Sequence, residues 1–491
     1  MFKYSSSGDV WMRGVVMVGI LSYGAYIPIW RISRTELSRA TGIPSMGGER
    51  AVAGWDEDSI TMAVEAGLDC ISDLDVRGVD ALHFATTTPP YIEKQNATII
   101  ASALDLRRDV SVADFTSSLR CGITAIRAAV DAIKSGRCKR VLVTVADCRL
   151  PVPGSAQEQI YGDAGVAFLL GKERGIAEVK EFHVLNEPIL GTWRRSEDRY
   201  VMQFDPRADN VVYVRVLSET IKALLEKAGL CLKDFSKIAF YANDPRQYVR
   251  AASAIGIDVK SQLQDFLFAD VGVTGAAHAL LLLAAALEDA KPGDRILCAG
   301  YGDGCEAFYV EVTDEIESIN EKRRGVKGHI RSKKLLPTYE LYMDFKRLRD
   351  RRWPEPAKAS VVTYWRDEIF ELPFYGMKCK ECGRITYPVA RVCRICGAKD
   401  KYEIVKLARR GKIFTYTYDF LLGPGGYPGD GVYPGIKAVI DLEDGTRVLL
   451  EVTDVLMGEL DVDMPVEVTF RLIHQKSDYR FYYWKARPVR G

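Results

Sequence analysis

The chain has 491 residues, of which 27% are charged and 47% are hydrophobic. This composition is sufficient for roughly two to four packed domains, and it excludes a disordered or fibrous protein. Lysine and arginine together number 67, and aspartate and glutamate number 66, which gives a net charge of +1. A nearly neutral chain has no overall attraction for nucleic acids or anionic membrane surfaces, so we expect neither as a partner.

The first 313 residues alternate β-rich runs with longer helical patterns. Strands that alternate with helices predict an α/β domain, residues 14–313, with largely parallel sheets. The predicted strands cover residues 15–21, 81–87, 110–115, 140–146, 165–170, 237–241, 295–299 and 307–312. The predicted helices cover residues 59–72, 97–103, 122–134, 212–227 and 275–289.

An internal repeat divides this part of the chain. Gly122 opens a long apolar helix, and Gly275 opens another. Each helix leads to a strand and then to a Gly-Asp turn, at Gly162 and at Gly302. We therefore predict two similar α/β halves in tandem, covering about residues 14–171 and 172–313.

Residues 314–364 break the alternation and form a predicted basic linker with a helix. Seven of the thirteen residues from 322 to 334 are lysine or arginine. Two interpretations remain open. The charges belong to a solvated linker, or they form a strap that attracts phosphate groups of a ligand.

From residue 365 onward the pattern becomes all-β. A cysteine-rich segment, residues 365–405, precedes a run of alternating segments in residues 406–491. Five short strands after a metal-binding knuckle predict a small Greek-key barrel of the OB type. A Gly- and Pro-rich stretch at residues 423–431 predicts a mobile loop. The predicted strands cover residues 412–418, 436–442, 447–451, 466–472 and 480–485.

Four of the eleven cysteines form two CxxC pairs, and ten residues separate the pairs. Four thiolates at this spacing can converge tetrahedrally on one Zn²⁺ ion, and such a closed site is structural rather than catalytic. Gly383 and Gly397 follow the pairs, where a tight turn requires a residue tolerant of positive φ. An iron centre of the rubredoxin type remains the alternative. The four predicted ligands are Cys379, Cys382, Cys393 and Cys396.

The other seven cysteines are scattered along the chain. An odd total with one tight cluster does not fit a disulfide framework, so we expect a reducing, cytoplasmic compartment. No apolar run approaches the ~20 residues that a transmembrane helix needs.

Cys121 lies where a predicted strand passes through a short polar turn into a helix. The helix dipole and the free N–H groups at such an elbow favour a thiolate, and acyl-transfer enzymes use this geometry for a nucleophilic cysteine. The alternative interpretation is a small buried helix residue, as free cysteines usually are.

Several motifs together resemble the 3-hydroxy-3-methylglutaryl-CoA synthase branch of the thiolase superfamily. They are the run at residues 18–28, the start of the helix at residues 118–126, and the Gly-Asp turns at residues 161–165 and 301–304. This resemblance implies a five-layered αβαβα fold of two related halves. Residues 356–488 resemble the zinc-ribbon/OB-fold acyl-CoA-binding family that partners thiolases and synthases.

The synthase family uses a glutamate acid/base, a cysteine nucleophile and a histidine. The position of the family's cysteine corresponds to Leu119, next to Ser118, and Cys121 comes two residues further along the chain. The position of the family's histidine corresponds to Asn243. The glutamate position falls in residues 85–88, which contain no carboxylate. The resemblance therefore implies these candidate residues: catalytic Cys121 and Asn243, and substrate-binding Ser118 and Thr274.

The resemblance implies a coenzyme A thioester as substrate or ligand, carbon–carbon condensation or cleavage as the reaction, and a homodimer. Because the usual catalytic positions are substituted, we predict an acyl-CoA-binding protein that works together with a thiolase partner. The alternative is a self-sufficient acyltransferase that uses Cys121. Whether the chain is an enzyme or a non-catalytic subunit stays open at this point. A nucleic-acid-binding zinc ribbon is disfavoured by the neutral charge.

Overall fold

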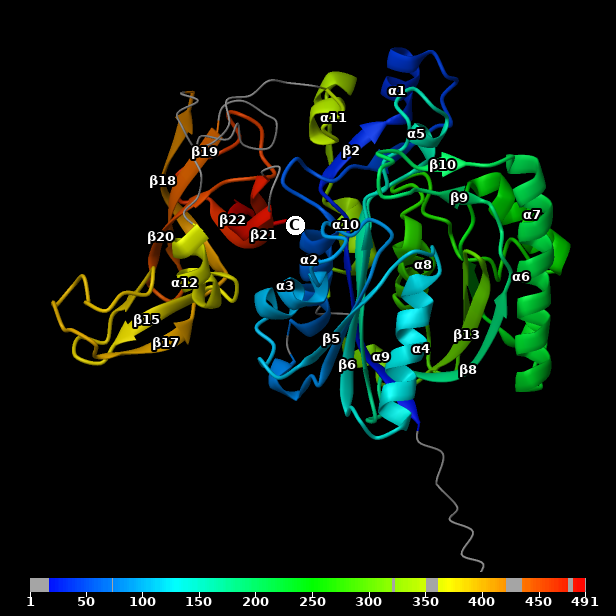
Figure 1. The fold of residues 1–491 in the computed structure, drawn as a ribbon, viewed down its shortest axis with the longest axis horizontal. Coiled ribbons are helices and arrows are strands. Elements are labelled where there is room, and N and C mark those ends of the chain that lie inside the picture. The colour runs from blue at the N-terminus through cyan, green and yellow to red at the C-terminus, as the bar shows by residue number, and fades with distance from the viewer. Residues whose placement is uncertain are drawn as a thin grey trace, which may run out of the picture.

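The computed structural model describes residues 17–72, 74–319, 323–349, 361–420, 435–475 and 480–490. The α/β domain is coloured blue to green in Figure 1, and the cysteine-rich segment and the barrel, yellow to red, lie beside it. The predicted mobile loop at residues 423–431 lies outside the described residues, as does Lys322 of the basic linker. None of the described helices is long and apolar enough to span a bilayer.

A nine-stranded sheet forms the frame of the α/β domain, in the order β11-β12-β13-β8-β1-β7-β6-β4-β5. All eight predicted strands are present with shifted ends, and β8 was not predicted. In chain order the strands are β1 (Val18–Tyr26), β4 (Ala81–Ala85), β5 (Ser111–Phe115), β6 (Arg140–Asp147), β7 (Ala164–Gly171), β8 (Ala177–Asn186), β11 (Lys237–Phe240), β12 (Arg295–Tyr301) and β13 (Gly304–Val312).

The prediction of largely parallel pairing is wrong. Only β11–β12, β4–β6 and β4–β5 pair in parallel, whereas the other neighbours in this sheet are antiparallel. One of the antiparallel pairs, β12–β13, follows from a tight turn. The turn at Gly302 and Asp303 joins β12 directly to β13, and a tight turn can only reverse the chain, since a parallel pair needs a long crossover.

The predicted internal repeat is confirmed by the strand order. The series β1-β7-β6-β4 and the series β8-β13-β12-β11 run antiparallel, antiparallel and then parallel. The two halves meet where β1 pairs with β8.

Helices cover both outer sides of the domain and also fill its centre (Figure 1). The outer helices are α2 (Ser59–Ile71) and α3 (Asn96–Ala103) on one half, and α6 (Pro206–Ala228) and α7 (Pro245–Ile255) on the other. The central helices α4 (Cys121–Lys134) and α8 (His278–Leu287) contact strands of both halves. Every residue of α8 is buried, which explains its continuous apolar sequence. The result is five layers, αβαβα.

Gly122, the second residue of α4, lies in close contact with the second half of the domain. A Cβ atom there would lie 3.1 Å from the carbonyl oxygen of Ala276 and 3.1 Å from the side chain of Leu280. The start of α4 therefore packs closely against the start of α8 and the residues before it, and a glycine leaves room for this contact.

Shorter elements complete the domain. They are β2 (Trp30–Ser33), α1 (Arg34–Thr41), β3 (Glu49–Ala51), α5 (Gln157–Ile160), β9 (Thr192–Trp193) and β10 (Met202–Gln203). The linker contributes α9 (Ile316–Ile319), α10 (Gly325–Arg331), β14 (Lys334–Leu335) and α11 (Tyr339–Phe345), and α12 (Val361–Glu371) follows it.

Basic side chains of the linker pair with carboxylates on both domains. Lys333 lies 3.3 Å from Asp270 of the α/β domain, and Arg324 lies 3.3 Å from Glu467 of the barrel. The linker thus fastens the two domains together, and its attraction for ligand phosphates stays a prediction.

The cysteine-rich segment and the barrel form two small sheets. The first contains β15 (Tyr375–Cys379), β16 (Ile385–Thr386) and β17 (Tyr402–Lys406). The second has the order β20-β19-β18-β21-β22, and a bridge between Val452 and Ala486 brings its two edges together. This nearly closed barrel agrees with the predicted OB type. Its strands are β18 (Arg410–Asp419), β19 (Gly435–Leu442), β20 (Arg447–Glu451), β21 (Pro465–Gln475) and β22 (Arg480–Pro488).

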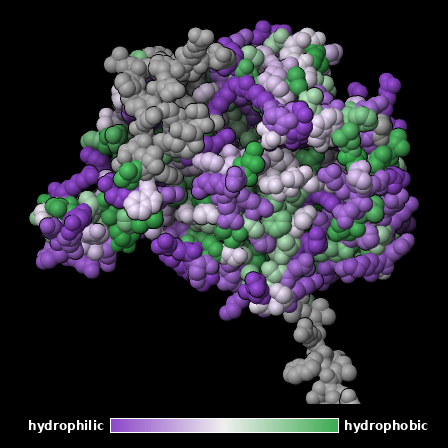
Figure 2. Space-filling view, viewed as in Figure 1, coloured by the Kyte–Doolittle hydropathy of each residue, from purple (hydrophilic) through white to green (hydrophobic). Residues whose placement is uncertain are grey.

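The barrel docks on α2 and on the loop before it through buried charges. Arg471 lies 3.1 Å from Glu57, Arg487 lies 2.8 Å from Glu65, and Lys485 lies 3.0 Å from Asp56. The cysteine-rich segment projects from this assembly, and hydrophilic and hydrophobic residues are interspersed on the face seen in Figure 2.

Candidate functional site

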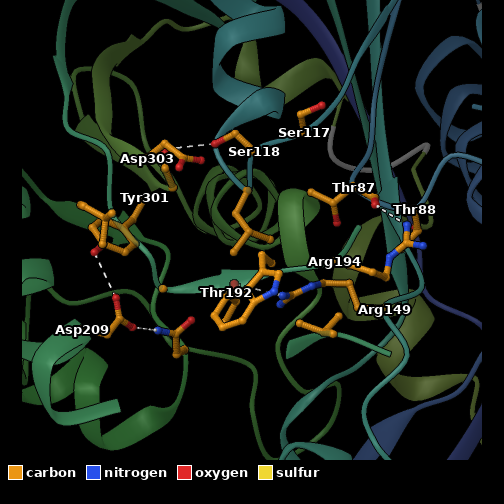
Figure 3. Close-up of a pocket in the computed structure, with 17 residues that line it drawn as sticks. Thr87, Thr88, Ser117, Ser118, Arg149, Thr192, Arg194, Asp209, Tyr301 and Asp303 are labelled. Carbon is orange, nitrogen blue, oxygen red and sulfur yellow. Dashed lines mark hydrogen bonds between the residues drawn. The ribbon is translucent and has the colours of Figure 1, made fainter. Parts of the chain in front are cut away.

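A cavity of about 120 Å³ lies at the junction of the two halves of the α/β domain (Figure 3). Its walls come from the turn after β4, the elbow before α4, the segment around β9, the first turn of α6, and the turn between β12 and β13. These segments are far apart in the sequence, and polar and apolar groups alternate on the walls.

The elbow between β5 and α4 supplies Ser118 and Leu119 to the cavity. Ser118 Oγ donates a hydrogen bond to the carbonyl of Gly302, at 3.0 Å. A Cβ atom on Gly302 would lie 2.7 Å from Ser118 Oγ and 2.9 Å from the amide nitrogen of Leu119. The elbow of the first half packs directly against the Gly-Asp turn of the second half, so only a glycine fits at position 302.

Cys121 is the first residue of α4, but it lies behind the cavity wall rather than on it. Only 4% of its surface is exposed. Burial, together with the nearby negative charge of Asp147, raises the pKa of the Cys121 thiol well above its usual value. The thiol is therefore protonated at neutral pH, and its environment opposes the thiolate that a nucleophile requires.

Asn243 follows β11 and lines the same cavity as Ser118. Its side-chain nitrogen donates to Asp209 Oδ2 at 3.0 Å, and its side-chain oxygen accepts from the Tyr241 hydroxyl at 3.1 Å. Ser118 and Asn243 thus line one cavity, while the substrate-binding role of Ser118 and the catalytic role of Asn243 stay predictions.

Thr274 does not reach the cavity wall. Its side chain is fully buried, and its hydroxyl oxygen lies 3.4 Å from Nδ1 of His278. Its substrate-binding role stays a prediction without geometric support from the lining of this cavity.

Asp209 is a cavity residue that the sequence analysis missed. It lies in the first turn of α6, is 4% exposed, and accepts hydrogen bonds from Asn243 and from the Tyr301 hydroxyl, the latter at 3.3 Å. Burial raises the pKa of Asp209 overall, although both hydrogen bonds lower it. The available signal was an acidic residue at a helix N-terminus, which usually only complements the helix dipole.

The turn after β4 contains threonines where the resemblance placed a glutamate. Asp147, at the end of β6, holds this turn: its carboxylate accepts six hydrogen bonds from the hydroxyl of Thr86, from the hydroxyl and amide groups of Thr87 and Thr88, and from the amide of Ala276. Because Asp147 is completely buried and so fully engaged, it positions the turn instead of replacing the missing glutamate.

Arg149 lines the opposite side of the cavity from Asp209 in Figure 3. It is 4% exposed, and one guanidinium nitrogen donates to Thr192 at 3.3 Å. The other terminal nitrogen, Nη1, is buried and has no hydrogen-bond partner among the described residues. Burial alone would lower the pKa of Arg149, but Tyr161, Tyr241 and Asp147 raise it overall. The guanidinium therefore stays charged and places a cation at the cavity wall.

The four predicted metal ligands lie together in the projecting segment. Their sulfur atoms are all within 4.8 Å of one another, and the Cys379–Cys396 and Cys382–Cys393 sulfur pairs are 3.6 and 3.8 Å apart. Zn–S bonds of about 2.3 Å in a tetrahedron give sulfur separations of about 3.8 Å. Gly383 and Gly397 have φ values of 70° and 77°, as predicted. The residues therefore fit one tetrahedral zinc ion.

Comparisons with known proteins show similarity to two kinds of protein. The family of the ChsH2 C-terminal OB-fold domain matches residues 404–471. The hydroxymethylglutaryl-CoA synthase of Pyrococcus furiosus is 31% identical over 344 residues, which cover 68% of this chain and 98% of that protein. The synthase of Methanosphaera stadtmanae is 30% identical over 341 residues, covering 67% and 98%.

Solved structures agree on the fold. MvaS in complex with 3-hydroxy-3-methylglutaryl coenzyme A has a TM-score of 0.61 at 20% identity, covering 70% of this chain and 95% of that one. The 3-oxoacyl-(acyl carrier protein) synthase III FabH from Pseudomonas aeruginosa has a TM-score of 0.55 at 20% identity, covering 60% and 98%. The α/β domain thus has the thiolase-like fold, and an OB-fold domain follows it. With 31% identity across two thirds of its length, the chain belongs to the hydroxymethylglutaryl-CoA synthase family.

Proposed function

We propose that the cavity binds the acyl end of a coenzyme A thioester and that the protein acts in carbon–carbon condensation or cleavage without an acyl–cysteine intermediate. The observation that carries this proposal is the position of Cys121. Its thiol is buried and protonated behind the wall, whereas Ser118, Leu119 and Asn243 line the cavity. The membership in the synthase family supports the substrate class, since the relatives are named hydroxymethylglutaryl-CoA synthases.

Among the described residues no cysteine lines the cavity, and this restricts the reaction class. Leucine cannot form an acyl-thioester, and the asparagine at the histidine position cannot transfer a proton near neutral pH. Aldol-type bond formation or cleavage needs only proton transfer and stabilisation of an oxyanion. A thiolytic step would need a thiol from elsewhere, which favours a separate thiolase as partner.

Two features support the proposal that the chain forms a homodimer and a complex with a thiolase. The OB-fold domain resembles a domain of ChsH2 and is fastened to the synthase-like domain by buried ion pairs. Strand β5 is at the edge of the nine-stranded sheet and pairs only with β4 in the described part of the chain, so a second copy can extend the sheet there. Size-exclusion chromatography after co-expression with a thiolase checks the homodimer and the complex. A chain that elutes alone as a monomer contradicts both.

Replacing Leu119 with tryptophan should weaken acetyl-CoA binding at least roughly tenfold, because a larger side chain at the elbow fills the cavity. Isothermal titration calorimetry with acetyl-CoA measures the effect. The matched control is Leu190→Trp, since Leu190 is 57% exposed and does not line the cavity. Equal affinities of the two variants would contradict the proposed binding site.

The second candidate function is a self-sufficient synthase that uses Cys121, and the position of this residue at the start of α4 favours it. We expect no acetyl adduct of about 42 Da on Cys121 after incubation with acetyl-CoA, because a buried protonated thiol is a poor nucleophile. Peptide mass spectrometry measures the adduct. Alkylation of exposed Cys231 by iodoacetamide provides the positive control. A stoichiometric acetyl group on Cys121 would establish the second candidate instead.

A further inference from the structure

The cavity contains a carboxylate that no resemblance predicted and whose surroundings suit proton transfer. Asp209 lines the wall, is almost fully buried, and is fixed from two sides by the Asn243 amide and the Tyr301 hydroxyl. Asn243 is in turn fixed by Tyr241. Figure 3 shows Tyr301 and Asp209 linked on one side of the cavity, across from Arg149. A buried carboxylate held in a single orientation is the arrangement that general bases share.

The other ionisable groups near the cavity are less suited to this task. The Cys121 thiol and the Asp147 carboxylate lie behind the wall, and six hydrogen bonds already occupy Asp147. His278 is fully buried off the cavity, and burial lowers its pKa to about 3. Asp303 also lines the cavity, but it is exposed, unlike Asp209.

We infer that Asp209 is the acid/base of this cavity and that it removes a proton from the α-carbon of a bound acyl-CoA. The carboxylate accepts the proton as the C–H bond breaks, and the bonding electron pair forms an enolate with its negative charge on the thioester oxygen. The reverse step returns a proton from the Asp209 carboxyl group to the α-carbon and regenerates the thioester. In heavy water the carboxyl proton exchanges with solvent, so a deuterium replaces the hydrogen of the substrate.

Arg149 complements this step from the opposite wall. Its guanidinium lines the cavity and stays charged, and a fixed cation is suited to stabilise an oxyanion that forms there. A carboxylate base and a fixed cation on facing walls are sufficient for enolate chemistry without a cysteine.

This inference rests on the proposed binding of an acyl-CoA. Two measurements on the full chain distinguish a failure of acyl-CoA binding from a failure of proton transfer by Asp209. Calorimetry with acetyl-CoA reports binding, and NMR in heavy water reports loss of the methyl protons of acetyl-CoA. Asp209→Asn should lower the exchange rate about 10²–10⁴-fold with the affinity retained. The control Glu219→Gln changes an exposed carboxylate on the same helix and should leave the rate unchanged.

The pH profile supplies a second readout that a merely structural Asp209 would not change. The base works when ionised, so exchange should decline as pH falls through the raised pKa of Asp209. Tyr301→Phe removes a hydrogen bond that lowers this pKa and should therefore move the decline to higher pH. This variant keeps the inference testable if Asp209→Asn does not fold.

The possible results have distinct meanings. Exchange that is lost in Asp209→Asn and shifted in Tyr301→Phe supports the inference. Exchange retained in Asp209→Asn, or an unshifted profile in Tyr301→Phe, overturns it. Binding of acetyl-CoA without any exchange also overturns it and leaves the proposed function standing. If acetyl-CoA does not bind, the proposed function fails and this inference fails with it.

Discussion

Replacing Arg471 with methionine should destabilise the docking of the OB-fold domain by about 3–5 kcal/mol, because it leaves a buried cluster of carboxylates without its central cation. Arg471 is completely buried and lies 3.1 Å from Glu57, 3.0 Å from Asp454 and 3.5 Å from Asp56. Glu57 and Asp56 belong to the α/β domain, and Asp454 belongs to the barrel, so one guanidinium joins the two domains.

The neighbouring cations replace Arg471 only in part. Lys485 lies 3.0 Å from Asp56, and Arg487 lies 3.8 Å from Asp454. Burial raises the pKa of Glu57, although the charge of Arg471 lowers it in part. Without that charge, Glu57 should become protonated in the Arg471→Met variant.

Urea unfolding and limited proteolysis measure this effect. In the variant, the barrel should become protease-sensitive at urea concentrations where the α/β domain stays folded. Arg447→Met is the matched control, because Arg447 pairs with Asp441 on the exposed surface of the barrel and should contribute less than about 1 kcal/mol. Indistinguishable unfolding of the two variants would show that the buried cluster does not hold the domains together.

Replacing Cys382 with serine should abolish metal binding and unfold the cysteine-rich segment while the α/β domain stays folded. The buried apolar core of this segment consists of Met377, Cys379 and Cys393, which is too small to support a fold alone. Zinc held by four thiolates supplies roughly 10–16 kcal/mol of apparent binding free energy, and in such knuckles this is folding free energy.

Elemental analysis and hydrogen exchange test this expectation. The native chain should contain one metal ion, and the variant should lose both the ion and the amide protection of β15 and β17. Cys231→Ser should change neither, because Cys231 is exposed and outside the cluster. A native chain that contains neither zinc nor iron would refute the metal site, and a native chain that contains iron would support the rubredoxin-type alternative.

Much of the secondary structure could be predicted from local sequence patterns. Amphipathic and fully apolar runs have periods that the backbone imposes, so the helices at α2, α4 and α8 and the strands of the barrel could be predicted from residue spacing. The repeat could be predicted as well, because equal local signals recur at Gly122 and Gly275. Strand β8 was not among the predicted strands, and its alternation of apolar and polar residues shifts by one position between Lys180 and Glu181.

The direction in which neighbouring strands pair could not be predicted from the strand sequences alone. The antiparallel pairing of β12 with β13 follows from the tight turn at Gly302. The sequence marked this turn between the same two strands, although we expected largely parallel pairing. In the same way, the sequence placed Ser118 and Asn243 as counterparts of a family site. The offset of two residues between Leu119 and Cys121 is about 200° of rotation on a helix, so the sequence also predicts that Cys121 points away from the family's cysteine position. The structure places Cys121 behind the wall.

The sequence by itself determined the features that depend on near neighbours: the helices, most strands, the repeat, and the four-cysteine cluster, whose spacing already fixes its geometry. Only the tertiary structure decided the features that depend on distant residues. Asp209 meets Asn243 and Tyr301 from 34 and 92 residues away, and Arg471 meets Asp56 and Glu57 from the other domain. A lone acidic residue or arginine carries no periodic signal, because its burial, its partners and therefore its pKa exist only after the chain has folded around it.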